Sequence, residues 1–237
     1  MNERLNFTNS RKQSLVGVLE LPDRPDSHFP VVIFAHGMGS SKESKKALEL
    51  ARRLKLYGIA VFRFDFTGCG ESDGRFSDTL VSRLADDLKA AYNKVYSHER
   101  VDINRIGIVG SSLGGMVSIL AVYQGLNPKT MVLISPATDF KENHSKPRVE
   151  DCISNEFYLD TWKRDFYEMA GFIKVPVLVV HGDVDDVCFL SGSRKLAEKL
   201  GPESMLEVIK GEGHYYKRPE GFDRMMDLTV GWLRRHL

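Results

Sequence analysis

The chain has 237 residues, of which 42% are hydrophobic and 27% are charged, and its formal net charge at pH 7 is +1. This balance is typical of a globular protein and excludes a largely disordered chain. Because the charge is near zero and no basic tract is present, we expect neither nucleic acid nor an anionic membrane surface as a partner. The three cysteines, Cys69, Cys152 and Cys188, are too widely spaced to suggest a disulfide framework or a zinc site.

The length favours one α/β domain that spans residues 1–237. The segment from Met1 to Gln13 is polar and lacks the apolar core of a signal peptide. The apolar runs elsewhere are strand-sized and far too short to span a bilayer. The sequence therefore predicts a cytoplasmic protein without a membrane span.

Short apolar runs alternate with segments of helical periodicity along the chain. The expected strands cover residues 15–21, 31–35, 59–64, 105–109, 131–134, 175–180 and 205–209. The expected helices cover residues 47–54, 80–95, 113–121, 196–200 and 222–233. We expect the first strand to be antiparallel and the helix at 113–121 to be amphipathic. The alternation predicts an α/β fold with a mostly parallel central sheet and helices on both faces.

Residues 138–174, after the strand at 131–134, interrupt this alternation with a longer and more polar segment. Its second half places Trp162, Phe166 and Met169 at helical spacing. Because long connections in compact domains usually serve function, we expect a small lid beside the site. Trp162 and Phe166, together with Phe189, are candidate pocket residues, although aromatic side chains at helical spacing more often belong to the core.

A GxSxG run, from Gly110 to Gly114, directly follows the apolar run 105–109 and has Ser112 at its centre. A serine between a strand and a helix in such a run is typical of a nucleophile elbow, where small neighbours make room for a strained backbone. By chance, a GxSxG run would occur in roughly one chain in ten of this length. The case for Ser112 as a nucleophile therefore depends on an acid and a histidine that follow it in the chain.

His214 and Asp185 supply that order of Ser, then Asp, then His. A serine hydroxyl needs an adjacent base to take its proton, and the base needs a third group to orient its ring. His214 follows the last expected strand, and Asp185 follows the strand before it. Asp183 and Asp186 are rivals for the role of the acid.

Two backbone N–H groups are candidates for an oxyanion hole. Leu113 follows the nucleophile at the start of a helix, where N–H groups point at a developing negative charge. The second donor is expected in the loop at residues 36–39, with Met38 as the best candidate.

The chain resembles the α/β-hydrolase family, and within it the small-lid serine esterases and S33-peptidase-like hydrolases, a group that includes feruloyl and cinnamoyl esterases. The matching segments are residues 36–40, 65–74, 110–115, 181–185 and 211–214. In that family the acid lies four residues after the histidine of an HG pair, which favours Asp185. The chain departs from the family at Cys69, where His or Arg is common, and at Cys188–Phe189, which replaces Val–Pro.

These residues predict a serine hydrolase that cleaves small to medium carboxylic esters through an acyl-enzyme, with a small-molecule ester as its partner. We expect no cofactor and no metal, because no group of His, Cys and carboxylates has metal-ligand spacing and no phosphate-binding glycine motif occurs. An acyl-thioesterase, a monoacylglycerol lipase and an aminopeptidase or amidase are alternatives on the same triad. A non-catalytic ligand-sensing or interaction protein is the alternative of another class, and a homodimer is left open.

Overall fold

The computed structural model describes residues 1–24, 28–139 and 153–237. One sheet contains the strands β1 (Asn2–Thr8), β2 (Ser14–Glu20), β3 (Phe29–Ala35), β4 (Ala60–Phe64), β5 (Val101–Ser111), β6 (Thr130–Ile134), β7 (Val177–Gly182) and β8 (Met205–Ile209). The strands lie in the order β1-β2-β4-β3-β5-β6-β7-β8. β2 is antiparallel to both of its neighbours, and the other pairs are parallel. The predicted fold class, a mostly parallel α/β sheet, is confirmed.

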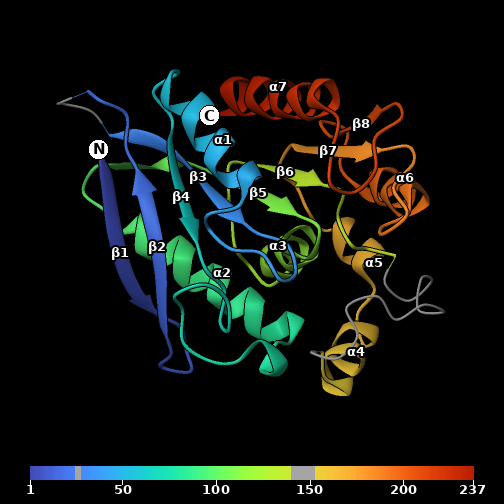
Figure 1. Cartoon of the computed structure of the whole chain (residues 1–237), viewed down its shortest axis with the longest axis horizontal. Helices are drawn as coiled ribbons and strands as arrows, with labels where there is room; N and C mark the ends of the chain where they lie inside the picture. The colour runs from blue at the N-terminus through green and yellow to red at the C-terminus, as the bar shows by residue number, and fades with distance from the viewer. Residues whose placement is uncertain (25–27, 140–152) are drawn as a thin grey trace.

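Helices cover both faces of the sheet (Figure 1). They are α1 (Lys45–Lys55), α2 (Val81–Tyr96), α3 (Leu113–Tyr123), α4 (Asn155–Trp162), α5 (Phe166–Ala170), α6 (Leu190–Lys199) and α7 (Pro219–His236), with a short 3-10 helix η1 (Phe76–Asp78). α1 and α7 pack on one face, and α2, α3 and α6 pack on the other, so that each face has its own hydrophobic core. In the part of the chain that the structure describes, none of these helices combines the length and hydropathy needed to cross a bilayer. The location of the protein in the cell stays a prediction.

The first strand, β1, is one that the hydrophobic pattern did not predict. Residues 2–8 alternate between exposed and half-buried positions, and only Leu5 and Phe7 pack against the core. A strand at the edge of a sheet buries one face only partly, so its apolar signal is weak. The strand predicted at 15–21 is therefore the second in the sheet, and its antiparallel pairing is confirmed.

The helix after Ser112 is not amphipathic, so that expectation was wrong. Every residue of α3 from Leu113 to Ala121 is buried. α3 packs on β5 and is covered in turn by α2 and α5. A helix enclosed on all sides needs no polar face.

The segment 138–174 lies partly outside the described residues, which omit residues 140–152. The spacing of Trp162, Phe166 and Met169 suggested one helix in the second half of this segment. The structure instead has two helices there, α4 and α5. The second helix starts anew because the Asp165 carboxylate accepts hydrogen bonds from the N–H groups of Tyr167 and Glu168. A lid function for this segment stays a prediction.

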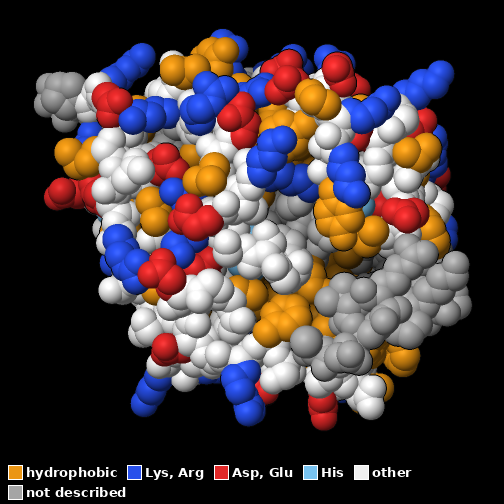
Figure 2. Space-filling view, in the orientation of Figure 1, with side chains coloured by type: hydrophobic (Ala, Val, Ile, Leu, Met, Phe, Trp, Pro, Cys, Tyr) orange, Lys and Arg blue, Asp and Glu red, His pale blue; other side chains and the backbone are white. Residues whose placement is uncertain are grey.

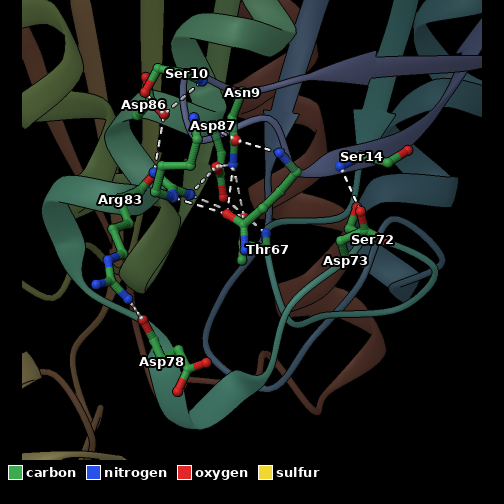
Figure 3. A network of polar contacts seen from close by, with 12 residues as sticks. Asn9, Ser10, Ser14, Thr67, Ser72, Asp73, Asp78, Arg83, Asp86 and Asp87 are labelled. Atoms are coloured by element: carbon green, nitrogen blue, oxygen red, sulfur yellow. Dashed lines mark hydrogen bonds and ion pairs between the residues drawn. The ribbon is translucent and has the colours of Figure 1, made fainter.

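A buried polar network ties the turn between β1 and β2 to α2 and to the glycine-rich loop at residues 65–76 (Figure 3). The Asn9 Nδ2 donates to Asp87 Oδ1 at 2.7 Å, and the Thr67 N–H donates to Asp87 Oδ2 at 2.9 Å. Asp86, the neighbour of Asp87, accepts from the Ser10 hydroxyl at 2.8 Å. Because the glycine-rich loop lies next to the loop after β3, this network also supports the surroundings of the predicted site.

A buried ion pair joins these two loops directly. Lys42 Nζ lies 2.6 Å from Asp65 Oδ2 and 2.6 Å from Glu71 Oε1, and the Lys42 and Asp65 side chains are almost fully buried. The Asp65 carboxylate also accepts from the backbone N–H groups of Lys42 and Glu71. Burial lowers the pKa of Lys42, but its two carboxylate partners outweigh burial and hold the pKa above its ordinary value.

We predict that Lys42→Met destabilises the protein by about 3–5 kcal/mol, because it leaves the Asp65 carboxylate buried without its cation. The measurement is urea unfolding followed by circular dichroism. Arg4→Met is the control, since Arg4 pairs with Glu71 at an exposed position and such pairs contribute little. Equal midpoints for Lys42→Met and wild type would contradict this account of the loops.

Candidate active site

Ser112 occupies a sharp turn between the end of β5 and the start of α3. Its backbone has φ 54° and ψ −116°, a conformation that L-residues rarely adopt and that costs on the order of 1–3 kcal/mol. The Ser112 N–H donates to the carbonyl of Ile134 at 2.9 Å, which fixes the turn to β6. This is the geometry expected of the predicted nucleophile elbow.

Two glycines make the turn sterically feasible. A Cβ on Gly114 would lie 2.1 Å from the carbonyl oxygen of Ala35, and a Cβ on Gly110 would lie 2.6 Å from the carbonyl oxygen of Gly114. Both neighbours are backbone atoms, which cannot move aside cheaply. The glycines of the motif therefore let α3 pack closely against β3 and β5.

The structure brings together the three side chains predicted as a triad. His214 Nε2 lies 3.0 Å from Ser112 Oγ, and His214 Nδ1 lies 2.8 Å from Asp185 Oδ2. The three residues follow β5, β7 and β8, whose carboxyl ends meet at one edge of the sheet. Residues far apart in the sequence thus form one continuous chain of hydrogen bonds.

Asp185 is buried and has partners on both carboxylate oxygens. Its Oδ1 accepts from the N–H groups of Val187 and Cys188, each at 2.9 Å, while Oδ2 faces the ring nitrogens of His214 and His181. Burial raises the pKa of Asp185, but the hydrogen bonds from His181 and His214 outweigh burial and hold the pKa well below its ordinary value. Asp185 therefore stays ionised at neutral pH.

The two rival aspartates differ from Asp185 in burial. Asp183 is exposed, and its Oδ1 accepts from the Gly211 N–H. Asp186 is exposed as well. Asp185 is buried and lies against the His214 ring.

His181 is a second histidine on Asp185. Its Nε2 lies 2.9 Å from the Cys188 carbonyl and 3.2 Å from Asp185 Oδ2, so this nitrogen faces two acceptors and must carry a hydrogen. Its Nδ1 lies 2.7 Å from Ser193 Oγ. His181 thereby fixes the loop that carries the acid.

The loop after β3 lies directly against the nucleophile. A Cβ on Gly37 would be 3.4 Å from the Ser112 Cβ. His36 holds this loop: its Nε2 accepts from the Phe66 N–H at 3.2 Å, so Nδ1 carries the hydrogen and donates to the Gly37 carbonyl at 2.8 Å. Burial lowers the pKa of His36, which agrees with a neutral ring.

The two predicted oxyanion donors line one hollow beside Ser112. The hollow has about 190 Å³ of empty space, part of it open to solvent. It is lined by His36, Gly37, Met38, Gly39, Phe66, Cys69, Phe76, Thr79, Leu84 and Leu113. Neither the Met38 nor the Leu113 N–H has an acceptor among the described residues, so both groups are available to a ligand.

The predicted pocket aromatics lie outside this hollow. Phe166 is buried in the core on the α3 face, whereas Trp162 and Phe189 are 41% and 43% exposed. None of the three is among the residues that line the hollow. On the face shown in Figure 2, hydrophobic side chains gather near the centre, next to the residues drawn in grey.

The two described cysteines are free, and both lie near the site. Cys188 is buried beside Ser112, and burial raises the pKa of its thiol well above the ordinary value. Cys69 lines the hollow, and burial together with Asp65 and Asp87 raises the pKa of its thiol to about 11. Both thiols are therefore protonated at neutral pH and poorly nucleophilic. No group of three potential metal ligands occurs among the residues that the structure describes.

Lys46 is a residue near the triad that sequence reasoning missed. Its Nζ lies 3.3 Å from Ser111 Oγ and 3.5 Å from the carbonyl oxygen of His214. In the sequence it is the second lysine of a pair at the start of a helix, with nothing to distinguish it from its exposed neighbour Lys45.

The sequence is similar to a family profile and to several known proteins. The sequence profile of the family "Serine aminopeptidase, S33" matches residues 26–157. A mouse (Mus musculus) protein, palmitoyl-protein thioesterase ABHD10, mitochondrial, is 31% identical over 241 residues, which cover 89% of this chain and 78% of that protein. The uncharacterized protein Rv2307c of Mycobacterium tuberculosis is 30% identical over 88% of this chain and 69% of its own length.

Solved structures share the fold. The structure of Est1E from Butyrivibrio proteoclasticus with ferulic acid bound superposes with a TM-score of 0.83, at 19% identity, over 97% of this chain and 96% of that one. Together with the matching family profile, which spans more than half of the chain, these likenesses agree with the elbow and the sheet order described above. The chain therefore belongs to the serine aminopeptidase S33 family of the α/β-hydrolase superfamily.

Proposed function

We propose that this hydrolase is a serine esterase that cleaves small to medium carboxylic esters through an acyl-enzyme. The observation that carries the proposal is the hydrogen-bonded chain from Ser112 through His214 to Asp185. Each link has the length and the chemical partners that general-base activation of a serine needs.

In the first half of the proposed reaction, Ser112 Oγ attacks the ester carbonyl while His214 Nε2 takes the serine proton. Asp185 keeps hydrogen on His214 Nδ1, which leaves Nε2 free to act as the base, and its negative charge stabilises the imidazolium that forms. The N–H groups of Met38 and Leu113 hold the oxyanion of the tetrahedral intermediate. His214 then returns the proton to the leaving alcohol.

In the second half, a water molecule takes the place of the alcohol. His214 accepts a proton from that water as it attacks the acyl carbonyl, and Ser112 leaves with the proton returned. Because Asp185 stays ionised far below neutral pH, we propose that it supports both halves of the cycle unchanged.

A thioester is the second candidate substrate class. The likeness to a mouse protein described as a palmitoyl-protein thioesterase favours it, since the same triad would attack a thioester carbonyl in the same way. The hollow is lined by apolar side chains that include Phe66, Leu84 and Leu113, which favours an apolar acyl group in either class.

Replacement of the nucleophile or the base tests the proposal. We expect Ser112→Ala and His214→Ala each to lower kcat on p-nitrophenyl acetate by a factor on the order of 10⁴–10⁶, with unchanged circular dichroism. Labelling by a fluorophosphonate probe should vanish in Ser112→Ala and persist in Ser97→Ala, an exposed serine at the end of α2. A wild-type protein that neither hydrolyses esters nor takes the label would point instead to a non-catalytic protein with this fold.

The two aspartates of the loop after β7 provide a matched pair. Asp185→Asn should lower kcat by a factor on the order of 10³–10⁴, because the amide can hold His214 in the wrong tautomer. Asp183→Asn should leave kcat within about a factor of three, since Asp183 is exposed and only contacts the Gly211 backbone. If Asp183→Asn were the more damaging change, the proposed acid would be wrong.

Acyl length and leaving group are tested on one panel of substrates. Because the proposed substrates are small to medium esters, we expect kcat/KM to be highest within the range from p-nitrophenyl acetate to octanoate and to fall for palmitate. A hydroxycinnamate ester and the acetyl and butanoyl thioesters complete the panel. A clear optimum at palmitate would reject the proposed substrate size, and a preference for thioesters at equal chain length would favour the second candidate.

A further inference from the structure

The ammonium group of Lys46 reaches from α1 to two of the elements that carry the triad. It lies 3.3 Å from the hydroxyl of Ser111, the residue before the nucleophile, and 3.5 Å from the carbonyl oxygen of His214. It also lies 5.2 Å above the centre of the Tyr216 ring, in the loop that carries His214. Lys46 therefore bridges the nucleophile elbow and the histidine loop.

This cation has no carboxylate within 4.0 Å among the described residues. Lys42, three residues before α1 begins, is buried and contacts two carboxylates, whereas Lys46 is half-buried. Burial lowers the pKa of Lys46 to about 8, even though the Asp185 carboxylate and Cys188 oppose that shift. At pH 7 the group is still mostly protonated, so the site holds a charge that reduces the stability of the fold.

The charged and titratable groups around His214 come from several elements. They are Asp185, His181 and Cys188 around the β7 loop, Ser112 at the elbow, Lys46 on α1, and Tyr216 in the histidine loop itself. Of these, Asp185 is ionised and lies directly against the His214 ring. A protonated ring cannot accept the proton of Ser112, so the anion that orients the base also opposes its availability.

We infer that Lys46 is a positioning residue for the proposed hydrolysis: its ammonium group holds the histidine loop against the elbow, and its positive charge keeps the His214 ring neutral at lower pH. This inference rests on the proposed function. The field of Lys46 offsets that of Asp185 at the ring, while the hydrogen bond from Asp185 that orients the ring remains. The positive charge of Lys46 thus extends the pH range in which His214 can accept the proton of Ser112.

The experiment compares pH profiles of kcat/KM on p-nitrophenyl acetate from about pH 5 to about pH 9. In Lys46→Met and Lys46→Gln, we expect the acid side of the profile to move to higher pH by about half to one unit, because a cation 3.5 Å from the His214 carbonyl oxygen is lost. Lys46→Arg keeps the charge and should stay close to wild type. Lys45→Met is the matched control, since Lys45 is exposed and its Nζ lies over the Phe222 ring.

Two further readouts separate this role from a structural one. Lys46→Met should unfold at the same or a higher urea concentration than wild type at pH 7, because a half-buried charge without a close counter-ion is removed. NMR titration of the His214 ring should show the same upward shift in Lys46→Met without any turnover. That titration distinguishes failure of this inference from failure of the proposed esterase activity.

Three results would overturn the inference. The first is a loss of kcat/KM by one factor at every pH in Lys46→Met with no shift of the profile. The second is an unchanged titration of the His214 ring in both Lys46→Met and Lys46→Gln. The third is an equal shift in the Lys45→Met control, which would indicate a general effect of surface charge.

Discussion

The strained backbone at Ser112 is the constraint on which the rest of the site depends. Ser112 has φ 54° between a strand and a helix, and it is held in that conformation because α3 packs closely on β3 and β5. Gly110 and Gly114 permit that approach, and the Ser112 N–H is bound to the carbonyl of Ile134 on β6. The cost of the conformation is offset by the buried core around α3, whose residues from Leu113 to Ala121 are all enclosed.

The remaining groups converge on that hydroxyl because the strands of a parallel sheet end at the same edge. The loops after β3, β7 and β8 carry the proposed oxyanion donor Met38, the proposed acid Asp185 and the proposed base His214. Each loop is fixed by buried polar contacts: His36 holds the first, His181 and two backbone N–H groups hold Asp185, and Lys46 contacts the third. Preorganisation of this kind is what lets weak individual hydrogen bonds act together on one reacting atom.

The sequence predicted the parallel core of the fold, and it singled out three side chains that the structure brings into contact, because those features leave local signals. β3 reads as a continuous apolar run since both of its faces are covered, and Ser112 stands in a glycine motif. β1 was missed because an edge strand with mixed polarity has no such signal. The helix α3 was misread because five apolar positions on one face match an amphipathic helix as well as an enclosed one.

The contacts of Lys46 and His181 could not be predicted, because they depend on which loops meet in space. Trp162 and Phe166 were predicted as pocket residues from helical spacing, and that spacing does not distinguish Phe166 in the core from Trp162 on the surface. The choice of Asp185 over Asp183 came from the resemblance to a family, and its position beside His214 depends on the turn after β7.

The central claim, that Ser112 becomes acylated during turnover, is tested most directly by rapid acid quench of the enzyme with p-nitrophenyl acetate, followed by peptide mass spectrometry. The account predicts an acetyl group on the peptide that contains Ser112, and fragmentation of that peptide should place the group on Ser112. Hydrolysis without any adduct there, or an adduct on Cys188 in its place, would contradict the account.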